Sequence, residues 1–333
     1  MSLPQIAFFS NHARLLSNVY PESRIDRIKT MGELYPTTVS LDNFHDHVES
    51  LSGIEYIFST WGMPALNAHQ ISEMPELKTV FYGAGTVKYF AEPFLAQGIK
   101  VVSAWAANAI PVAEFTVAQV ILAAKGYFAD SLRLRNQGSS GWQRPTMPGN
   151  YDISVSILGA GMVGREVIKR LKQLDVTILV FDPFLDAEQA SLMGVEKVGL
   201  SEAFSAGFIV SNHLANVKET ERMLTAELFR SMQANGVFIN TGRGDTVDES
   251  QMIEVLKQRE DIIALLDVTR DEPPDDDSPL YSMPNVWLSP HIAGSIGNEV
   301  VRMADMVIDE FQRELDGDAL QYEVTIDMFS SMA

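Results

Sequence analysis

Cysteine is absent from the 333-residue chain, which excludes disulfide bonds, thiolate zinc sites and a thiol nucleophile. Basic residues are scarce, because 25 Lys and Arg stand against 44 Asp and Glu, for a formal net charge of −19. A protein that binds nucleic acid or an anionic membrane surface needs a basic face, so neither partner is expected. An anionic substrate would have to be held by a few well-placed cations.

Long apolar runs are also missing. A membrane span needs about 18 uninterrupted apolar residues, whereas the longest stretch, Phe115–Ala124, contains Gln119 and is followed by Lys125. The N-terminal residues show no basic region ahead of an apolar one, so no secretory signal is expected. No cluster of residues has metal-ligand spacing, so no metal is expected either. The sequence therefore predicts a cytoplasmic protein without a metal site.

What is present is a composition typical of ordered domains, with 46% apolar and 21% charged residues. At about 150 residues per domain, the length favours two domains. In the first part of the chain, short apolar runs alternate with helix-like stretches, which indicates a parallel sheet covered on both faces. The strands are expected at 6–10, 34–40, 54–59, 79–82 and 101–103, and the helices at 24–31, 41–51 and 87–97.

The second part has stronger signals. Six strands with crossovers are the number expected of a doubly wound sheet that binds a dinucleotide. A long apolar helix is expected at 112–125, a loop or arm at 135–150, and an amphipathic last helix at 297–315 that needs a core to pack on. The six strands are expected at 153–158, 177–181, 208–213, 236–240, 262–268 and 286–290, and helices at 161–174 and 249–258.

The segment Gly159-Ala160-Gly161-Met162-Val163-Gly164 matches G-x-G-x-x-G between an expected strand and an expected helix. In such a motif Gly159 makes the tight turn, Gly161 lets the backbone approach a pyrophosphate, and Gly164 allows close contact between helix and strand. The phosphates then bind the free amides at the helix N-terminus.

Asp182 stands at the end of the next strand, where an acid accepts hydrogen bonds from the ribose hydroxyls. Its charge would repel a 2′-phosphate, so NAD is favoured over NADP. The alternative is an ordinary turn with a capping aspartate.

A second glycine pair, Gly83-Ala84-Gly85, follows another expected strand but lacks a third glycine. It is either a tight turn or a nest of backbone amides that binds a carboxylate.

Three ionisable residues, Arg243, Glu272 and His291, lie just after expected strands of the second part. Ligands in open α/β sheets bind outside the carboxyl ends of the strands, so the three can meet at one crevice. They suit hydride transfer to a carbonyl, in which histidine delivers the proton, a carboxylate supports it and arginine holds a substrate carboxylate. Alternatively, each is a structural or solvent-exposed residue.

Five ordered motifs resemble the D-isomer-specific 2-hydroxyacid dehydrogenase family over nearly the whole chain. They are Asn108 with Val112-Ala113-Glu114; the glycine motif with Asp182; Asn240-Thr241-Gly242-Arg243-Gly244; Asp267-Val268 with Glu272-Pro273; and Pro290-His291-Ile292-Ala293-Gly294.

The resemblance implies roles for these residues. Arg243 would bind substrate, Glu272 and His291 would be the acid–base pair, and Asp267 would hold the nicotinamide carboxamide. It favours the amide nest at Gly83, Ala84 and Gly85. Further cofactor contacts would come from Met162, Val163, His213 and Thr241.

The resemblance also implies a domain plan. A flavodoxin-like substrate domain would combine residues 1–103 and 294–333, a Rossmann NAD-binding domain would span 104–293, and the active site would lie in the cleft between them. Members are commonly homodimers joined through the cofactor domain, with 112–150 in that interface.

The sequence departs from the family pattern at several positions. Ala215 stands where a proline is common, and Met162 where an arginine is common, which affects cofactor affinity. Glu272 argues against the formate-oxidising branch, which has glutamine there. The loop 59–63 carries no cation, whereas phosphoglycerate-oxidising relatives tend to have one, so a non-phosphorylated substrate is expected. Trp61 in this loop either lines the cleft or packs between domains.

These observations predict an NAD-dependent D-2-hydroxyacid dehydrogenase that acts on a small (R)-2-hydroxy or 2-oxo acid. Two alternatives remain. One is an NAD(H)-sensing, corepressor-like protein of the same fold with little turnover. The other is a different dinucleotide enzyme in which the three ionisable residues coincide by chance.

Overall fold

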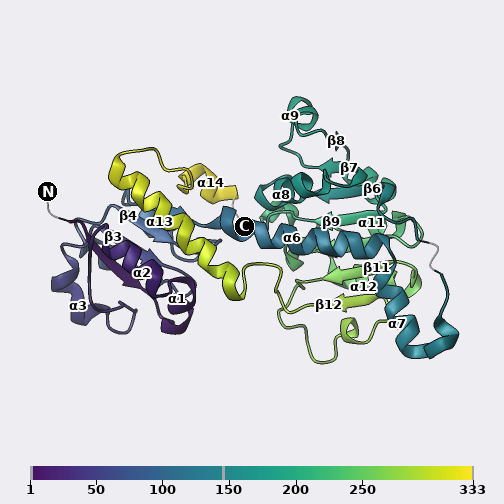
Figure 1. Ribbon diagram of the computed structural model, residues 1–333, viewed down its shortest axis with the longest axis horizontal. Helices are drawn as coiled ribbons and strands as arrows, with labels where there is room; N and C mark the ends of the chain where they lie inside the picture. The colour runs from purple at the N-terminus through teal and green to yellow at the C-terminus, as the bar shows by residue number, and fades with distance from the viewer. Residues whose placement is uncertain (1–2, 145–146, 332–333) are drawn as a thin grey trace. The chain divides into compact units, whose positions relative to one another are not determined.

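The computed structural model describes residues 3–144 and 147–331, and it divides the chain into two compact units. Unit 1 comprises residues 1–108 and 295–333, and unit 2 comprises residues 109–294. The chain therefore leaves unit 1 once and returns to it once, so that unit 1 is discontinuous and unit 2 is continuous. Figure 1 shows the elements of each unit in chain order.

Unit 1 is built on a parallel five-stranded sheet in the order β2-β1-β3-β4-β5. This is the flavodoxin-like order 2-1-3-4-5, which confirms the fold expected for the first part of the chain. All residues of β3 and β4 are buried, as expected of parallel strands covered on both faces. The strands are β1 (Gln5–Phe9), β2 (Glu33–Leu34), β3 (Tyr56–Ser59), β4 (Thr79–Tyr82) and β5 (Lys100–Ser103).

The strand expected at 34–40 is wrong in extent. Only β2 pairs as a strand, and farther along Val39 forms a single bridge with Phe9. Pro36 has no backbone N–H to donate, which explains why the ladder does not continue through this segment. The helices of unit 1 are α1 (Ala13–Val19), α2 (Glu22–Lys29), α3 (Phe44–Leu51), α4 (Ala68–Ser72), α5 (Glu92–Leu95), α13 (Val301–Asp316) and α14 (Ile326–Ser331).

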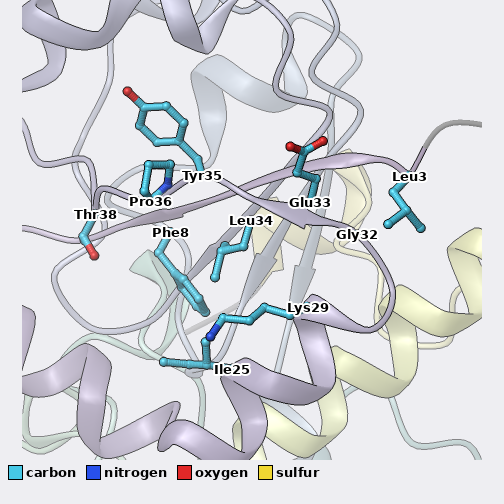
Figure 2. Close-up of a pocket in the computed structure, with 10 residues that line it drawn as sticks. All are labelled: Leu3, Phe8, Ile25, Lys29, Gly32, Glu33, Leu34, Tyr35, Pro36 and Thr38. Carbon is cyan, nitrogen blue, oxygen red and sulfur yellow. The ribbon is translucent and has the colours of Figure 1, made fainter.

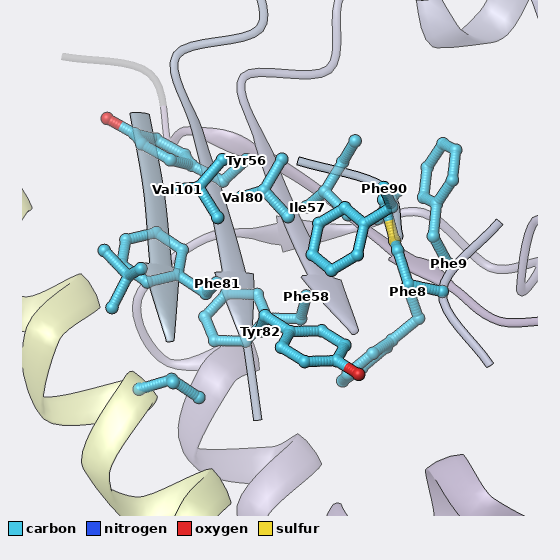
Figure 3. Packing of buried hydrophobic residues seen from close by; sticks show 14 of the residues in the cluster. Phe8, Phe9, Tyr56, Ile57, Phe58, Val80, Phe81, Tyr82, Phe90 and Val101 are labelled. Carbon is cyan, nitrogen blue, oxygen red and sulfur yellow. The ribbon is translucent and has the colours of Figure 1, made fainter. Parts of the chain in front are cut away.

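Helix α13 completes the core of unit 1. Its Phe311 ring lies 5.3 Å from the ring of Phe58 and 5.4 Å from that of Phe81, on β3 and β4. Phe58 and Phe81 are paired in register and stack at 5.1 Å (Figure 3). Burying one such ring stabilises the fold by about 1.5–3 kcal/mol. A bidentate pair from Arg24 on α2 to Asp305 adds a polar tie to the same helix. The expected amphipathic helix at 297–315 thus packs on the core of unit 1.

Unit 2 is built on a parallel seven-stranded sheet in the order β12-β11-β10-β9-β6-β7-β8. Counted from β6, this is the Rossmann order 3-2-1-4-5-6 with a seventh strand at one edge, so the expected dinucleotide-binding fold is confirmed. The sequence missed β8, because a two-residue exposed strand has no detectable period. The strands are β6 (Tyr151–Leu158), β7 (Asp175–Phe181), β8 (Glu196–Lys197), β9 (Ile209–Asn212), β10 (Val237–Asn240), β11 (Ile263–Leu266) and β12 (Val286–Leu288).

Helices cover both faces of this sheet. Helix α8 follows the glycine motif and α12 follows the loop that contains Arg243. Both lie where helices were expected, at 161–174 and 249–258. The helices and 3₁₀ turns are α6 (Trp105–Ala124), α7 (Tyr127–Gln137), η1 (Gly138–Gly141), α8 (Met162–Leu171), α9 (Ala187–Leu192), α10 (Leu200–Ala206), η2 (Lys218–Thr220), α11 (Ala226–Ser231), η3 (Gly244–Thr246), α12 (Glu249–Gln258), η4 (Pro279–Tyr281) and η5 (Gly297–Val300), the last in unit 1.

Two expectations about residues 105–150 need correction. The long helix expected at 112–125 starts earlier, at Trp105. Residues 135–141 of the loop expected at 135–150 are helical, because they belong to α7 and η1; residues 145–146 lie outside the described part. By length and composition alone, α6 could span a membrane: an 18-residue stretch of it has a mean hydropathy of 1.5, and 44% of this stretch is buried. Its buried residues Ala113, Val120, Ala123 and Ala124 belong to the core of unit 2, as in the core helix of a globular unit.

Candidate active site

The glycine loop of unit 2 has the geometry that its motif requires. Gly159 has a φ of +91°, and a Cβ there would lie 2.8 Å from the carbonyl oxygen of His213. A Cβ on Gly164 would lie 2.0 Å from the carbonyl oxygen of Gly159, so only glycine lets α8 approach β6 this closely. At Gly161, by contrast, a Cβ would meet nothing within 4 Å. Two glycines are thus required by packing, and the third faces open space.

The N-terminus of α8 fits a pyrophosphate. Gly161 is its N-cap and supplies no side-chain hydrogen bond, and the first turn carries no acidic residue. Free amides and the helix dipole therefore face the space beside Gly161. Asp182 Oδ2 accepts a 2.6 Å bond from Ala160 N, and its Oδ1 accepts bonds from the amides of Phe184 and Leu185. These bonds occupy about three of the four acceptor directions of the carboxylate and leave one for a ribose hydroxyl.

A chain of buried hydroxyls and one imidazole lies behind this loop, at the ends of β9 and β10. His213 Nε2 lies 2.9 Å from Ser211 Oγ, and Nδ1 lies 3.4 Å from Thr241 Oγ1, which lies 2.9 Å from Thr116 Oγ1 on α6. Burial lowers the pKa of His213 from its ordinary value of 6.5 to about 3. His213 is therefore neutral at physiological pH and serves as a hydrogen-bonding group without charge.

Arg243 follows β10 and is held by its backbone. Asn240 Nδ2 and Thr246 Oγ1 both donate to its carbonyl oxygen, at 3.3 and 2.8 Å, and Asn212 Nδ2 on β9 donates to Asn240 Oδ1 and to Thr246 Oγ1. Asn212, Asn240 and Thr246 are almost fully buried. The sequence did not reveal the hydrogen bond between the side chains of Asn212 and Asn240. It does not tell which strand ends lie side by side in the sheet.

The guanidinium of Arg243 is available for an anion. Within the described residues it donates one hydrogen bond, from Nη1 to the carbonyl oxygen of Gly242 at 2.7 Å. Burial lowers the pKa of Arg243, and the nearby negative charge of Glu272 works in the opposite direction. A desolvated guanidinium with unused donors favours a bound carboxylate, because a charged group in low dielectric needs a partner.

Glu272 and His291 form a pair in unit 2. His291 Nδ1 lies 2.6 Å from Glu272 Oε2, and both side chains are partly exposed, at 49% and 40%. A carboxylate on Nδ1 fixes the neutral tautomer with its proton there and leaves Nε2 for a second partner. Within the described part of the chain, Nε2 has no hydrogen-bond partner. The structure thus brings together two of the three candidate catalytic side chains directly, and the third, Arg243, feels the charge of Glu272.

Asp267 lies beneath this pair at the end of β11 and is 2% exposed. Its Oδ1 accepts bonds from Ser289 Oγ at 2.5 Å and from Ile292 N at 2.9 Å, and its Oδ2 accepts from Ala293 N at 2.8 Å. Its backbone carbonyl accepts from His291 N at 3.0 Å. The carboxylate is therefore satisfied by the loop that follows β12.

In unit 1, the loop Gly83–Gly85 is held by hydroxyl groups. Thr60 Oγ1 donates to Gly83 O at 2.8 Å, and Ser103 Oγ donates to the carbonyls of Ala84 and Gly85. The amide of Gly83 donates to Ser59 O, and that of Ala84 to Tyr82 O. Within the described residues, the amide of Gly85 has no partner. Of the three backbone N–H groups expected to form a nest, only that of Gly85 is left without an acceptor among the described residues and can donate to a ligand.

Two residues near this loop were not found from the sequence. A Cβ on Gly83 would lie 2.6 Å from the hydroxyl of the buried Tyr20, so this tyrosine explains the glycine. Tyr89 is 49% exposed, and its hydroxyl lies 3.2 Å from that of Tyr82. The indole of Trp61 is partly buried and packs against the core of unit 1. Only the tertiary structure reveals these neighbours.

A pocket on unit 1 lies away from these residues. It has a volume of about 700 Å³ and lies between α2 and β2, lined by Ile25 and Lys29 on one side and by Leu34 and Tyr35 on the other (Figure 2). None of the expected site residues lines it. Within the described part of the chain, no group of three or more His, Asp or Glu residues could hold a metal ion.

Comparisons with known proteins identify the family of the chain. Residues 118–293 match the family described as "D-isomer specific 2-hydroxyacid dehydrogenase, NAD binding domain". A D-3-phosphoglycerate dehydrogenase from Archaeoglobus fulgidus is 34% identical over 60% of this chain and 38% of its own length. A glyoxylate reductase from Korarchaeum cryptofilum is 29% identical over 73% of this chain and 75% of its own.

The fold is shared with solved structures. The apo form of D-mandelate dehydrogenase from Rhodotorula graminis superposes with a TM-score of 0.80 at 19% identity, covering 96% of this chain and 97% of that one. The chain spans 36–46% of the length of four curated phosphoglycerate dehydrogenases that it matches. The match covers more than half of the chain and includes the glycine loop, Asp182, Arg243, Glu272 and His291. The chain belongs to the D-isomer specific 2-hydroxyacid dehydrogenase family and carries its NAD-binding domain.

Proposed function

We propose that this protein is an NAD-dependent oxidoreductase that transfers a hydride between NAD(H) and C2 of a small (R)-2-hydroxy or 2-oxo acid. The observation that carries the proposal is the 2.6 Å pair of His291 and Glu272 beside the desolvated guanidinium of Arg243, in the unit that has the NAD glycine loop. A proton donor, its carboxylate partner and an anion-binding cation are what reduction of a 2-oxo acid requires.

Each side chain has one role in the proposed reaction. In the direction of reduction, His291 donates a proton from Nε2 to the carbonyl oxygen, and Glu272 stabilises the imidazolium from the other side of the ring. Arg243 of unit 2 binds the substrate carboxylate. In unit 1, the loop Gly83-Ala84-Gly85, with the free amide of Gly85, is the proposed amide nest for a carboxylate. Unit 1 is accordingly the substrate domain and unit 2 the NAD-binding domain.

The residues that would hold NAD surround the open space at Gly161. Bound NAD(H) supplies or accepts the hydride. The amides of Met162 and Val163 would bind the pyrophosphate, and Asp182 the ribose. Phe184, which is 90% exposed next to Asp182, offers no charge to a 2′-phosphate. His213, Thr241 and Asp267 complete the proposed cofactor contacts.

The proposed substrate is non-phosphorylated, because the loop 59–63 carries no cation. The segments 10–16, 59–66 and 83–91, which begin at or directly after the ends of β1, β3 and β4, also contain no acidic residue in a chain with a net charge of −19. Arg14 and Lys88 give these three segments a net positive charge, which favours a small organic anion despite the overall charge. Trp61 would line the substrate side of these loops.

We further propose a cytoplasmic homodimer without nucleic-acid or membrane partners. The segment 112–150 would supply the interface, and it exposes Tyr127 and Trp142, at 54% and 81%; Tyr151, directly after it in the sequence, is 72% exposed. Exposed aromatic residues of this size are typical of protein interfaces. Sedimentation velocity of the wild type and of Trp142→Asp would test this: a dimer that dissociates in the variant supports it, and a monomeric wild type contradicts it.

The direct test of the function is oxidation of NADH, and separately of NADPH, with glyoxylate, hydroxypyruvate, pyruvate, bulkier 2-oxo acids and 3-phosphohydroxypyruvate. Turnover with NADH and a non-phosphorylated acid is expected. A preference for the phosphorylated acid would overturn the substrate part of the proposal and direct attention to Arg14 and Lys88. Tight NADH binding without turnover of any acid would favour the sensor function instead.

A further inference from the structure

The loop that carries His291 is held in an unusual backbone conformation. His291 has a φ of +52°, in the left-handed region that favours glycine. A non-glycine residue persists there only where its surroundings fix it. The surroundings here are few and well defined, because the backbone N–H of His291 donates to the carbonyl oxygens of Asp267 and Ser289, both at 3.0 Å.

The carboxylate of Asp267 fixes the residues on both sides of His291. It accepts from the hydroxyl of Ser289, two residues before the histidine, and from the amides of Ile292 and Ala293, directly after it. Together with its backbone carbonyl, this residue directly after β11 thus receives four hydrogen bonds from the five-residue segment 289–293. A buried carboxylate needs such partners, and in turn the segment has one conformation in which all four bonds form.

We propose that Asp267 is a positioning residue for proton transfer, which holds His291 so that Nδ1 meets Glu272 and Nε2 is presented to the substrate. This proposal rests on the proposed function. It differs from the cofactor role that family resemblance implies for Asp267, since about three of the four acceptor directions of the carboxylate already point at the histidine loop. One direction remains for a cofactor amide, so the two roles require separate measurements.

Asp267→Asn is the first variant, because it keeps the shape but places an NH₂ group against a hydroxyl or amide donor. The matched control is Asp248→Asn. Asp248 is also a buried aspartate of unit 2, at 5% exposure. Its carboxylate accepts hydrogen bonds from Arg222, Ser250 and Gln251, none of which belongs to the segment 289–293. Ser289→Ala and Ser289→Thr form a second pair, which removes or keeps the hydroxyl donor to Asp267 without touching the carboxylate.

The first readout does not depend on turnover. An imidazole N–H bonded to a carboxylate at 2.6 Å gives a far-downfield proton signal in NMR, which His291→Gln assigns among the six histidines. We expect Asp267→Asn to lose this signal and Asp248→Asn to keep it. Retention of the signal in Asp267→Asn overturns the proposal, and so does its loss in both aspartate variants, because the effect would then be general.

The second readout is kinetic. With the preferred acid, kcat should fall at least about tenfold in Asp267→Asn and about threefold in Ser289→Ala, with recovery in Ser289→Thr, while the Kd of NADH for the serine variants stays within about twofold of the wild type. An Asp267→Asn enzyme with unchanged kcat and weaker NADH binding would assign Asp267 to the cofactor alone. If the wild type turns over no acid, the proposed function fails, and the NMR signal still decides whether Asp267 positions His291.

Discussion

The neutral, half-buried His213 makes the stability of unit 2 depend on pH in a defined direction. Its pKa is lowered by burial from 6.5 to about 3. Below pH 6.5 the unfolded chain therefore binds a proton at this position that the folded unit does not bind. Stability is fully present above the unfolded pKa and is lost as the pH falls toward the folded one. Between about pH 7.5 and pH 5, the loss from this one group is about 2 kcal/mol.

The assay compares the wild type with His213→Gln, which cannot titrate. Urea unfolding of unit 2 is followed by fluorescence in a background that keeps Trp287 as the single tryptophan, since its ring contacts Phe128 within unit 2 at 5.6 Å. The bonds that the variant loses to Ser211 and Thr241 are lost at both pH values, so they cancel in the comparison. His69→Gln is the control, because this histidine is 84% exposed.

The free energy of unfolding of the wild type should fall by about 2 kcal/mol more than that of His213→Gln between the two pH values. His69→Gln should follow the wild type. Parallel pH dependences in the wild type and His213→Gln would refute the reasoning, since they would mean that folded and unfolded His213 bind protons equally.

Three further predictions concern the site. Arg243→Ala should lower kcat/KM for the preferred acid at least about a hundredfold, equal to about 2.7 kcal/mol, and leave the Kd of NADH within about twofold; wild-type turnover would disprove its assigned role. Glu272→Gln should lower kcat about tenfold or more with little change in KM, because the amide accepts the imidazole proton but cannot stabilise its charge; an unchanged kcat would contradict this. Gly83→Ala should destabilise unit 1 by about 1–3 kcal/mol, and Tyr20→Phe should relieve part of this cost by removing the oxygen 2.6 Å from the new Cβ; additive changes in a double-mutant cycle would show that the two do not touch.

The sequence was most informative where the physical requirement is local. Gly159 and Gly164 must be glycine because of atoms in their own turn and in the strand beside it, and the family motif records that need. The parallel strands of both sheets likewise follow from alternating strands and helices, whereas the two strand orders were expected from the family resemblance. Short or irregular elements carry no such signal. The strand Glu196–Lys197 has too few residues to show a period, and Pro36 ended β2 where apolar alternation predicted a longer strand.

The candidate site shows the other limit. Arg243, Glu272 and His291 could be selected from their places after strands, but the 2.6 Å pairing depends on how two separate loops fold back. The amide of Ala84 was expected to face a ligand and instead donates to Tyr82 O, because a single peptide rotation decides its direction. Asp267 was selected for a cofactor role, and its four bonds to the histidine loop became visible only in three dimensions.

The return of α13 to unit 1 also fixes an order of assembly. Phe58 and Phe81 belong to the first third of the chain, whereas Phe311, which packs edge-on against both rings, is synthesised only after all of unit 2. On the ribosome, continuous unit 2 can therefore close before unit 1 has its last core side chain. Until then the aromatic rings of β3 and β4 lack their cover, so the newborn chain is most prone to aggregation, and most in need of a chaperone, in the interval between the two events.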